Sequence, residues 1–541
     1  MTSASSRTAS LINVFSSRVF RVAALASALL VSNALLATAP PQGSMLVFGR
    51  GGDSVGLDPA NRTDGESLNV TDHIFDSLVS FKPGTTDVEP AIAEKWDISK
   101  DGLTYTFHLR KGVKFHDDTP VDADAVIFSF MRQHDPKHPA YASGAPYGYY
   151  SDLGLEKLIK SITKSGPETV RFVLGEPFAP FLSVLGMQSM AIVSPTAVTK
   201  HMKDFGFNPV GSGPFRLVKW DRNQKITLAA NHTYWGGKPS VETLIFRSIP
   251  DNSTRLMEML AGKLDAMDNP SPDDIPVIEK RMGTKVRMAK QPGFNIAYLA
   301  MNQEKKPFDD VRVRRAINHA INRKGIVDAV YAGYAEVARN PMPPTLWGYN
   351  PNVRQYDYNP ETAKKLLAEA GLNDGFKTTL YAMPVPRPYM PNGRKVAEAI
   401  QGDLAKVGIT AEIVSFDWGT YLEKTRNGEH DMALLGWTGD IGDPDNFLYV
   451  LLDKDNAVKP AQNIAFYKSD KLHQILRKAR SETNHAKRVT LYKEAQAIIA
   501  EDAPLVTLAH SVDVVPVQTR VSGFVMDPTG RRRFDKVSIT P

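Results

Sequence analysis

The segment from residue 377 to residue 414 constrains the fold of this chain more than any other. Lys377–Ala382 and Ile409–Val414 have the composition of strands, and Arg394–Lys406 between them has the pattern of a helix. Two strands joined through a helix lie parallel in one sheet, because a tight hairpin cannot connect parallel strands. Strands and helices alternate elsewhere as well, so the sequence predicts an α/β protein.

Further elements can be placed by their apolar periodicity. Met45–Phe48 is expected to be a strand, and Leu68–Leu78 a helix. Asp309–Val327 is expected to form one helix, and Pro360–Ala370 forms an amphipathic helix with proline in its first turn and a glycine just past its end.

Chain length predicts more than one core. A chain of 541 residues exceeds what a single hydrophobic core usually supports, so two or more lobes are expected. With 42% hydrophobic and 23% charged residues, the composition is that of a soluble globular protein. The net charge of +6 is a weak argument for nucleic-acid binding, which needs basic residues clustered on one face. We therefore expect no nucleic-acid partner.

The N-terminal segment has the form of a secretory signal peptide. Arg7, Arg18 and Arg21 precede the apolar residues 22–39, VAALASALLVSNALLATA, which include small-residue triplets suited to cleavage. A membrane anchor is the alternative, but this segment is short for a membrane span and is interrupted by serine and asparagine. We expect residues 1–39 to be removed on export.

The sequence contains no cysteine. The mature chain therefore has no disulfide, no thiolate metal site, no cysteine nucleophile and no thiol to attach a lipid anchor. We expect the exported protein to be free in the periplasm of a Gram-negative cell.

The stretch Gly436–Phe447, GWTGDIGDPDNF, is the strongest candidate for a ligand pocket. It follows the apolar strand Met432–Leu435, and it combines glycines, which let a ligand approach the backbone, with an indole and three carboxylates. Clustered acids also suit glycoside hydrolysis or a calcium site, but the ligand order of a calcium-binding loop is absent. Asp443 and Asp445 are equally consistent with a helix N-cap, which leaves Asp440 for a ligand.

No catalytic or nucleotide-binding motif is complete. Gly52–Gly56 matches the Gly-x-Ser-x-Gly pattern of hydrolases, but the residues after Ser54 continue as a turn instead of the required helix. His134 and His138 flank a turn, and the sequence has neither a His-Glu-x-x-His helix nor a phosphate-binding loop. We expect no catalytic residue, metal or other cofactor. An exported hydrolase that uses Ser54 or the acids at 440–445 is the alternative class.

Arg387 is the cation that we expect to act together with Asp440. It lies in Ala382–Tyr389, AMPVPRPY, where three prolines stiffen the loop and favour bidentate contact between the guanidinium and a carboxylate. A surface arginine packed on Tyr389 is the alternative interpretation.

Several motifs resemble those of one family. They are Ala93–Trp96 (AEKW), Asp101–Asp117 (DGLTYTFHLRKGVKFHD), Asn208–Phe215 (NPVGSGPF), Tyr234–Pro239 (YWGGKP) and Pro343–Asn350 (PPTLWGYN). From about residue 45 to 541, the chain is similar to the extracytoplasmic solute-binding proteins of family 5, which serve peptide ABC transporters, and above all to dipeptide-binding members. The resemblance implies a monomer that is not an enzyme. It captures dipeptides between two lobes and delivers them to an inner-membrane permease with separate ATPase subunits.

The resemblance also implies a fold and its boundaries. The expected fold is the two-lobe α/β periplasmic binding protein fold, type II, of the large peptide-binding class, with an extra subdomain in lobe I. Lobe I would comprise residues 45–292 and 511–541, with the extra subdomain at about 76–208. Lobe II would comprise residues 293–510.

The matching motifs assign expected site residues. Asp440 and Arg387 would bind the ammonium and the carboxylate of a dipeptide, because two fixed opposite charges offset the desolvation of a zwitterion. Trp437 and Tyr389 would line the pocket with aromatic surface. The other expected ligand contacts are Thr438, Gly439 and Thr63, and weaker candidates are Tyr147, Tyr149 and Tyr150.

Two departures from the family pattern leave other solutes open. Dipeptide-binding members have cysteines that form disulfides, which this chain lacks, and the loop Asp53–Pro59 differs from its counterpart at the pocket border. The alternative solutes for the same transport role are an oligopeptide, glutathione, haem or a nickel complex.

Overall fold

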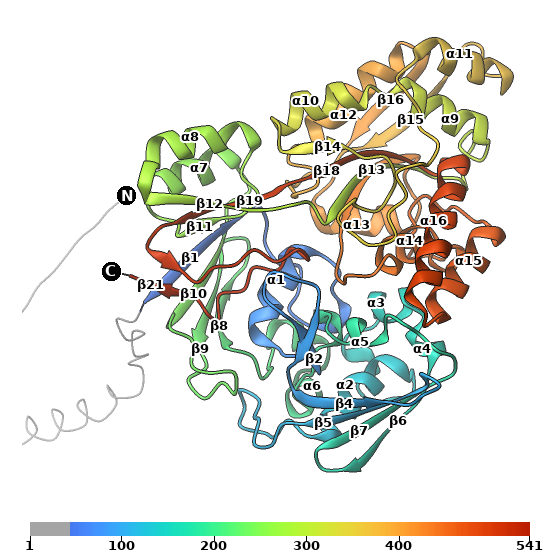
Figure 1. Ribbon diagram of the computed structural model, residues 1–541. Helices are drawn as coiled ribbons and strands as arrows, with labels where there is room; N and C mark the ends of the chain where they lie inside the picture. The colour runs from blue at the N-terminus through green and yellow to red at the C-terminus, as the bar shows by residue number, and fades with distance from the viewer. Residues whose placement is uncertain (1–43, 541) are drawn as a thin grey trace, which may run out of the picture. The chain divides into compact units, whose positions relative to one another are not determined.

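The computed structural model describes residues 44–540. The signal peptide predicted for residues 1–39 lies outside this range. The described residues belong to one compact unit with two large sheets and three smaller ones (Figure 1). Among them, no helix combines the length and the apolar character that a membrane span requires.

The first large sheet contains strands from both ends of the described chain. β1 lies at its centre and pairs in parallel with β10 and β11, whereas the outer strand pairs are antiparallel. In sheet order the strands are β12 (Val286–Gln291), β19 (Asp513–Gln518), β11 (Ala266–Met267), β1 (Met45–Arg50), β10 (Thr243–Ser248), β9 (Lys225–Ala230) and β8 (Phe215–Asp221). The helices nearest in sequence are α1 (Gly65–Ile74), α7 (Asn252–Leu260) and α8 (Ile275–Met282).

An antiparallel four-stranded sheet forms the core of the extra subdomain. In sheet order it contains β4 (Ala93–Ile98), β5 (Thr104–Leu109), β7 (Thr169–Leu174) and β6 (Ile159–Gly166). Its helices are α2 (Ala123–His134), α3 (Gly148–Asp152), α4 (Leu155–Leu158), α5 (Phe181–Val184) and α6 (Pro195–His201). Two small hairpins complete the strands, β2 (Val79–Phe81) with β3 (Val88–Pro90), and β20 (Val521–Ser522) with β21 (Ser538–Ile539).

The second large sheet has six strands. In sheet order they are β14 (Ala335–Val337), β18 (Leu505–Ser511), β13 (Asn295–Met301), β17 (Met432–Thr438), β15 (Phe376–Tyr381) and β16 (Ile409–Val414). β15 and β16 pair in parallel and are joined through α12 (Gly393–Ala405), which confirms the predicted strand–helix–strand unit. The remaining helices of this part are α9 (Val311–Ala320), α10 (Arg323–Tyr331), α11 (Pro360–Glu369), α13 (Trp418–Arg426), α14 (Asp445–Leu452), α15 (Asp470–Ser481) and α16 (His485–Asp502).

Two helix predictions need correction. The single helix expected over Asp309–Val327 is wrong, because the chain breaks between α9 and α10, where Asn322 accepts a hydrogen bond from the Gly325 N–H at 2.9 Å and caps α10. The helix expected over Leu68–Leu78 begins earlier, at Gly65, because Asp64 caps it by accepting from the Ser67 N–H, and it ends at Ile74. The strand β1 and the helix α11 confirm their predictions.

Two short segments connect the large sheets. The chain leaves the first sheet at β12 and enters the second at β13 through residues 292–294. It returns from β18 to β19 through Val512. β13 is buried along its whole length, and each residue of its neighbour β17 pairs with it. The residue limits of the two lobes remain a prediction.

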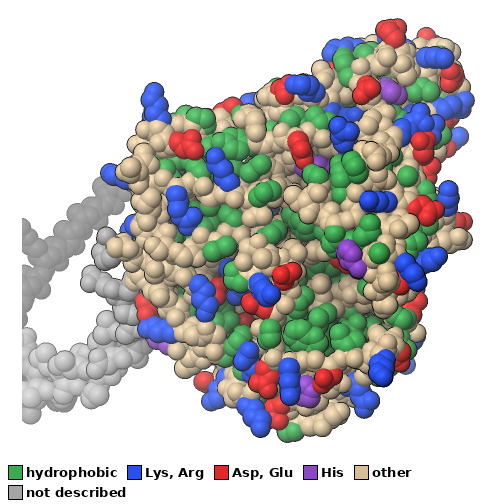
Figure 2. Space-filling model, in the orientation of Figure 1, with side chains coloured by type: hydrophobic (Ala, Val, Ile, Leu, Met, Phe, Trp, Pro, Cys, Tyr) green, Lys and Arg blue, Asp and Glu red, His purple; other side chains and the backbone are tan. Residues whose placement is uncertain are grey.

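Charged side chains of both signs are interspersed on the face drawn in Figure 2. Lysine and arginine alternate there with aspartate and glutamate, and apolar side chains show between them. This face therefore does not have the continuous basic surface that nucleic-acid binding uses.

Candidate functional site

A cavity of about 150 Å³ is lined by segments from distant parts of the chain. They include α1 with the turn before it, α3, the loop after β15, α13, the end of β17 and residues 529–532. Six of the seven predicted contact residues line this cavity: Asp440, Arg387, Trp437, Tyr389, Thr438 and Thr63. The fold thus brings together residues that the sequence separates by hundreds of positions.

The end of β17 positions the aromatic wall. A Cβ atom at Gly436 would lie 2.2 Å from Cδ2 of Tyr389 and 2.4 Å from the carbonyl oxygen of Ile296, so glycine lets the Tyr389 ring lie against the strand. The Trp437 indole donates a hydrogen bond to Asn446 Oδ1 at 3.0 Å, which fixes the ring beside the cavity. Gly436 and Trp437 therefore lie in the wall of the cavity.

Gly439 is the predicted contact that does not line the cavity. A Cβ atom there would lie 2.3 Å from Phe294 Cε1 and 2.7 Å from Phe447 Cε2, and the Gly439 N–H donates to the Phe294 carbonyl at 2.9 Å. Its glycine therefore permits close packing behind the cavity wall.

Asp440 is a carboxylate held by neutral hydrogen-bond donors. Its Oδ2 accepts from the Tyr149 hydroxyl at 2.9 Å and from Asn446 Nδ2 at 3.3 Å. Within residues 44–540 it forms no ion pair. Burial raises the pKa of Asp440 to about 6, against the opposing effect of these hydrogen bonds. A ligand ammonium would supply the missing cation.

Arg387 is buried and already has a carboxylate partner. Its Nη1 donates to Glu66 Oε1 at 3.0 Å, and its guanidinium lies 4.7 Å from the centroid of the Trp418 ring. Nη2 is buried without a hydrogen-bond partner among the described residues. Arg387 is 6% exposed, so the alternative of a surface arginine packed on Tyr389 is wrong.

Glu66 is a charged residue of the cavity lining that no sequence motif indicates. It lies in the first turn of α1, is 3% exposed, and its Oε2 lies 3.5 Å from Nη1 of Arg50. Burial raises the pKa of Glu66, and the nearby Arg387 and Arg50 oppose that rise. An acid in the first turn of a helix is common, so the sequence has no local signal for a partner 321 residues later.

The other acids of the Gly436–Phe447 stretch have structural partners and do not line the cavity. Asp443 forms a bidentate pair with Arg488 at 2.8 and 2.9 Å, and Asp445 lies 3.1 Å from Nε of Arg480. Asp443 Oδ1 also accepts from the Asp445 N–H at 3.0 Å, but the N-cap residue of α14 is Pro444, so the N-cap position expected for Asp443 or Asp445 is wrong. The three acids therefore do not act as one catalytic or metal-binding cluster.

The three weaker tyrosine candidates form contacts in different places. Tyr149 lines the cavity and contacts Asp440, whereas Tyr147 donates to the Tyr141 carbonyl at 2.8 Å. The Tyr150 hydroxyl lies 3.2 Å from Nδ1 of His134. Of the three, Tyr149 is the one whose position suits a ligand contact.

Ser54, the serine of the hydrolase-like motif, forms hydrogen bonds within the fold. Ser54 is 3% exposed, donates from Oγ to the Glu66 carbonyl at 2.9 Å and accepts from Arg50 Nη1 at 3.1 Å. A buried hydroxyl held by an arginine has no base to activate it. Its neighbourhood therefore does not favour the hydrolase alternative.

Buried donors dominate the unpaired polar atoms around the cavity. Six buried nitrogens of the lining lack a hydrogen-bond partner within the described range, whereas one buried oxygen, Asn269 Oδ1, lacks one. A ligand with several acceptor oxygens would satisfy them, as the carbonyls and carboxylate of a peptide do. The donors are Arg387 Nη2, Trp418 Nε1, Arg426 Nε, Gln462 Nε2, Arg531 Nη1 and Arg532 Nη1.

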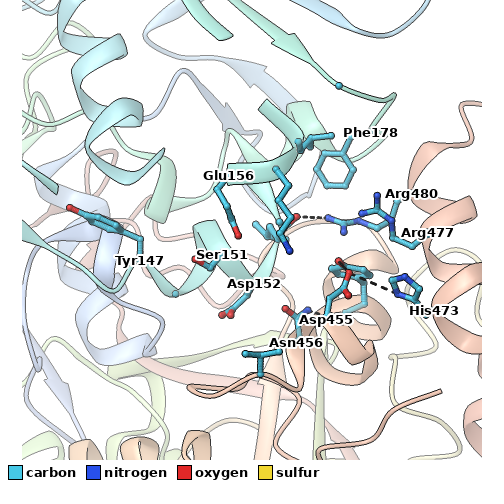
Figure 3. A pocket seen from close by; sticks show the side chains of 18 of the residues that line it. Tyr147, Ser151, Asp152, Glu156, Phe178, Asp455, Asn456, His473, Arg477 and Arg480 are labelled. Atoms are coloured by element: carbon cyan, nitrogen blue, oxygen red, sulfur yellow. Dashed lines mark hydrogen bonds and ion pairs between the residues drawn. The ribbon is translucent and has the colours of Figure 1, made fainter. Parts of the chain in front are cut away.

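A larger cleft of about 700 Å³ lies beside this cavity and shares Arg426 with it. Figure 3 shows Ser151, Asp152 and Glu156 on one side of the cleft and residues of α15 on the other. Nη2 of Arg426 lies 3.5 Å from Asp152 Oδ2, and burial raises the pKa of Asp152 to about 7. This ion pair lies where the two spaces meet.

One group of described residues has the composition of a metal site. Potential ligand atoms of Asp453, Asp455 and His473 lie within 4.8 Å of one another, at the wall of the larger cleft. Asp453 Oδ1 lies 2.9 Å from His473 Nδ1 and also accepts from the Asp455 N–H at 2.9 Å. These contacts already pair the group, so it needs no ion.

Comparison with known proteins agrees with this architecture. Residues 87–459 match the model of the bacterial extracellular solute-binding proteins, family 5. The dipeptide-binding protein of Escherichia coli (strain K12) is 42% identical over 94% of this chain and 96% of its own. Heme-binding protein A of Haemophilus influenzae is 41% identical over 90% of each chain. A periplasmic binding protein of Helicobacter pylori, solved in complex with the peptide STSA, is 43% identical, with a TM-score of 0.87 over 92% of this chain and 98% of its own.

The two-sheet architecture with its extra subdomain is the two-lobe α/β fold of type II periplasmic peptide-binding proteins, as the sequence predicted. The chain belongs to the bacterial extracellular solute-binding proteins, family 5. Members of this family are solute-binding proteins and not enzymes.

Proposed function

We propose that this chain is the periplasmic solute-binding component of an ABC transporter, and that it captures short peptides, dipeptides first, for delivery to an inner-membrane permease. One observation favours this most: a single cavity contains Asp440, a half-buried carboxylate without an ion pair among the described residues, and Arg387, a buried cation with an unpaired donor. A peptide has the matching ammonium and acceptor oxygens. Relatives named for dipeptide binding and a neighbour solved with a peptide support the same ligand class.

The ligand contacts that we propose are Asp440 for the ammonium and Arg387 for the carboxyl end. Tyr389 and Trp437 would pack on ligand side chains, which apolar contact accommodates without strict selection. Thr438 and Thr63 also line the cavity.

The lobe division supports capture by closure. Lobe I would comprise residues 45–292 and 511–541, and lobe II residues 293–510. The connections at 292–294 and at Val512 lie close to these limits. Glu66 and Arg387 then belong to different lobes, and so do Tyr149 and Asp440, so that both contacts would form on closure.

The remaining parts of the proposal concern the mature protein. We propose that residues 1–39 are cleaved on export, that the mature chain is a monomer, that it is free in the periplasm without a lipid, and that it has no enzymatic activity. The absence of cysteine supports the lipid-free state. The engaged Ser54 and the paired Asp443 and Asp445 support the lack of catalysis.

A thermal-shift experiment with ligand analysis tests the proposal. The protein is unfolded, freed of ligand and refolded, then incubated separately with dipeptides, tripeptides, glutathione, haem and a nickel–histidine complex. We expect dipeptides to raise the melting temperature and to be recovered intact by mass spectrometry, because a ligand that binds the native state stabilises it. A shift with haem or nickel alone, or release of free amino acids, would contradict the proposal.

A further inference from the structure

Asn269 has the one buried oxygen of the cavity lining that lacks a hydrogen-bond partner within the described range. The residue lies two positions after β11 and is 8% exposed. The six other buried unpaired atoms of the same lining are nitrogens, which donate. A ligand with acceptor oxygens alone would satisfy those nitrogens but leave the Asn269 oxygen unpaired, at a cost in binding free energy. The cavity therefore also suits a ligand with a donor group.

The side-chain amide of Asn269 is held in one orientation. Its Nδ2 donates to Asp268 Oδ2 at 3.1 Å, and Arg255 Nη2 donates to the backbone carbonyl of Asn269 at 3.2 Å. Asp268 forms an ion pair with Arg532 at 2.9 Å, and a carboxylate in an ion pair can only accept hydrogen bonds. Turning the amide over would place its oxygen against that carboxylate and remove the Nδ2 hydrogen bond. The oxygen is therefore the side-chain atom of Asn269 that a ligand donor can satisfy.

Asn269 lies beside the loop that contains Arg387. Both residues line the cavity, and both also line a second, smaller space of about 30 Å³. The next residue of each segment, Pro270 and Pro388, lines that smaller space as well. A buried unpaired acceptor, Asn269 Oδ1, thus neighbours a buried unpaired donor, Arg387 Nη2. One ligand segment that has an acceptor and a donor close together would satisfy both.

The carboxyl-terminal residue of a peptide has the two groups that match this pair. Its carboxylate and its backbone N–H are attached to the same carbon atom, so an acceptor and a donor lie close together in every peptide. Arg387 is the proposed contact of the carboxylate, which leaves the N–H of the same residue for Asn269. This N–H is neutral, and the Asn269 oxygen can accept from it without the burial of a further charge.

We propose that Asn269 is a specificity-determining residue that accepts a hydrogen bond from the peptide N–H of the ligand residue whose carboxylate Arg387 binds. This inference rests on the proposed peptide-binding function. It makes the cavity distinguish a peptide bond from an ester, which has no N–H at that position. Asn269 belongs to the proposed lobe I and Arg387 to the proposed lobe II, so the last residue of the ligand would contact both lobes.

The test compares a dipeptide with its ester analogue. In alanyl-phenyllactic acid an oxygen replaces the peptide N–H of alanyl-phenylalanine, while the ammonium and the carboxylate remain. Calorimetry at pH 7 gives the dissociation constants of both ligands for the wild-type chain and for Asn269→Gly, in which glycine adopts the native φ of 47° without strain. We expect the wild type to bind the dipeptide about tenfold more tightly, because the ester leaves the Asn269 oxygen unpaired. Asn269→Gly should lose this preference.

Asn223→Gly is the matched control. Asn223 also has a positive φ, 59°, but it is exposed and does not line the cavity, so this variant should keep the wild-type ratio of the two constants. A wild-type ratio in Asn269→Gly, or an equal change in both variants, would overturn the inference while leaving peptide binding intact. A ratio near one in the wild type would overturn it even if Asn269→Gly failed to fold. Binding of neither ligand to the wild type would overturn the inference together with the proposed function.

Discussion

At the scale of single residues, the surroundings of a carboxylate decide its role more than its place in a motif. Asp440, Asp443 and Asp445 lie within six positions of one another, yet two of them pair with arginines and one faces the cavity. Burial raises the pKa of Asp440 to about 6 because no cation within residues 44–540 pairs with it. A carboxylate that is ionised without a cationic partner lowers the stability of the ligand-free protein. A ligand that supplies the positive charge restores that stability.

Asp440→Asn should separate binding from stability. We expect it to weaken dipeptide binding by about 2–5 kcal/mol, because the ligand ammonium would be buried unpaired. The folded-state pKa of Asp440 lies above its unfolded value, so ionisation at pH 7 destabilises the ligand-free fold. The variant should therefore be more stable to urea by about 1 kcal/mol. Asp328→Asn, at an exposed aspartate of α10, is the control and should change neither quantity. Unchanged affinity in Asp440→Asn would rule out the assigned contact.

Ligand affinity should depend on pH through the same residue. Asp440 binds an ammonium in its ionised form, so affinity is full above pH 7 and falls as the pH drops through about 6. With alanyl-phenylalanine, whose carboxylate stays ionised across this range, the dissociation constant at pH 5 should be about tenfold that at pH 7. Calorimetry at both pH values measures this. A constant affinity across the range would contradict the raised pKa of an unpaired Asp440.

Asp443→Asn should lower the stability of the protein and leave peptide binding unchanged, the opposite of Asp440→Asn. It removes one partner of a buried pair and leaves Arg488 without its counter-charge, so the free energy of unfolding should fall by about 3–5 kcal/mol. Because Asp443 does not line the cavity, peptide affinity should stay near that of the wild type. Urea denaturation and calorimetry together check this. Loss of affinity without loss of stability would show that a second acid of the stretch contacts the ligand.

Among the secondary-structure elements, β17 is a mostly buried strand whose C-terminal end forms part of the cavity wall. The strand lies beside the fully buried β13, and Gly436 lets the Tyr389 ring reach the strand backbone. The loop that contains Arg387 is held by the same contact, because Tyr389 lies two residues further on and the Tyr331 hydroxyl donates to its carbonyl at 2.8 Å. Packing at one glycine thus helps to place the cation.

Gly436→Ala tests this placement against a matched glycine. A methyl group at Gly436 would overlap Tyr389 and Ile296, so we expect a loss of about 1–3 kcal/mol of stability together with weaker peptide binding. Gly402→Ala, in the exposed face of α12 with no atom within 4 Å, should instead stabilise the protein by about 0.5–1 kcal/mol and leave binding unchanged. Equal effects of the two substitutions would contradict the role of Gly436.

Secondary-structure elements can largely be predicted from the sequence. Contacts between residues far apart in the chain cannot. The parallel pair β15 and β16 was predictable because its strands and helix have distinct periodicities. The break between α9 and α10 was missed, since the apolar pattern continues through the capping residue Asn322. Glu66 was missed for another reason: its partner Arg387 is 321 positions away, and tertiary packing alone brings them together.

At the scale of the whole molecule, ligand contacts and lobe contacts involve the same residues. Arg387 and Asp440, for which we propose the ligand contacts, are also joined to Glu66 and Tyr149 on the segments proposed to form the other lobe. A ligand that completes both groups would therefore stabilise the closed arrangement by its differential contacts. Short connections at 292–294 and Val512 suit such a motion.

Calorimetry with three forms of one peptide shows whether the cavity recognises both ends of a peptide. Alanyl-phenylalanine, its N-acetyl derivative and its C-terminal amide are titrated into refolded protein at pH 7. We expect acetylation, which removes the ammonium for Asp440, to abolish measurable binding, and we expect the C-terminal amide, which lacks the carboxylate for Arg387, to bind more weakly than the free dipeptide. Binding of the N-acetyl derivative with undiminished affinity would contradict the claim that Asp440 recognises the amino end of a peptide in this cavity.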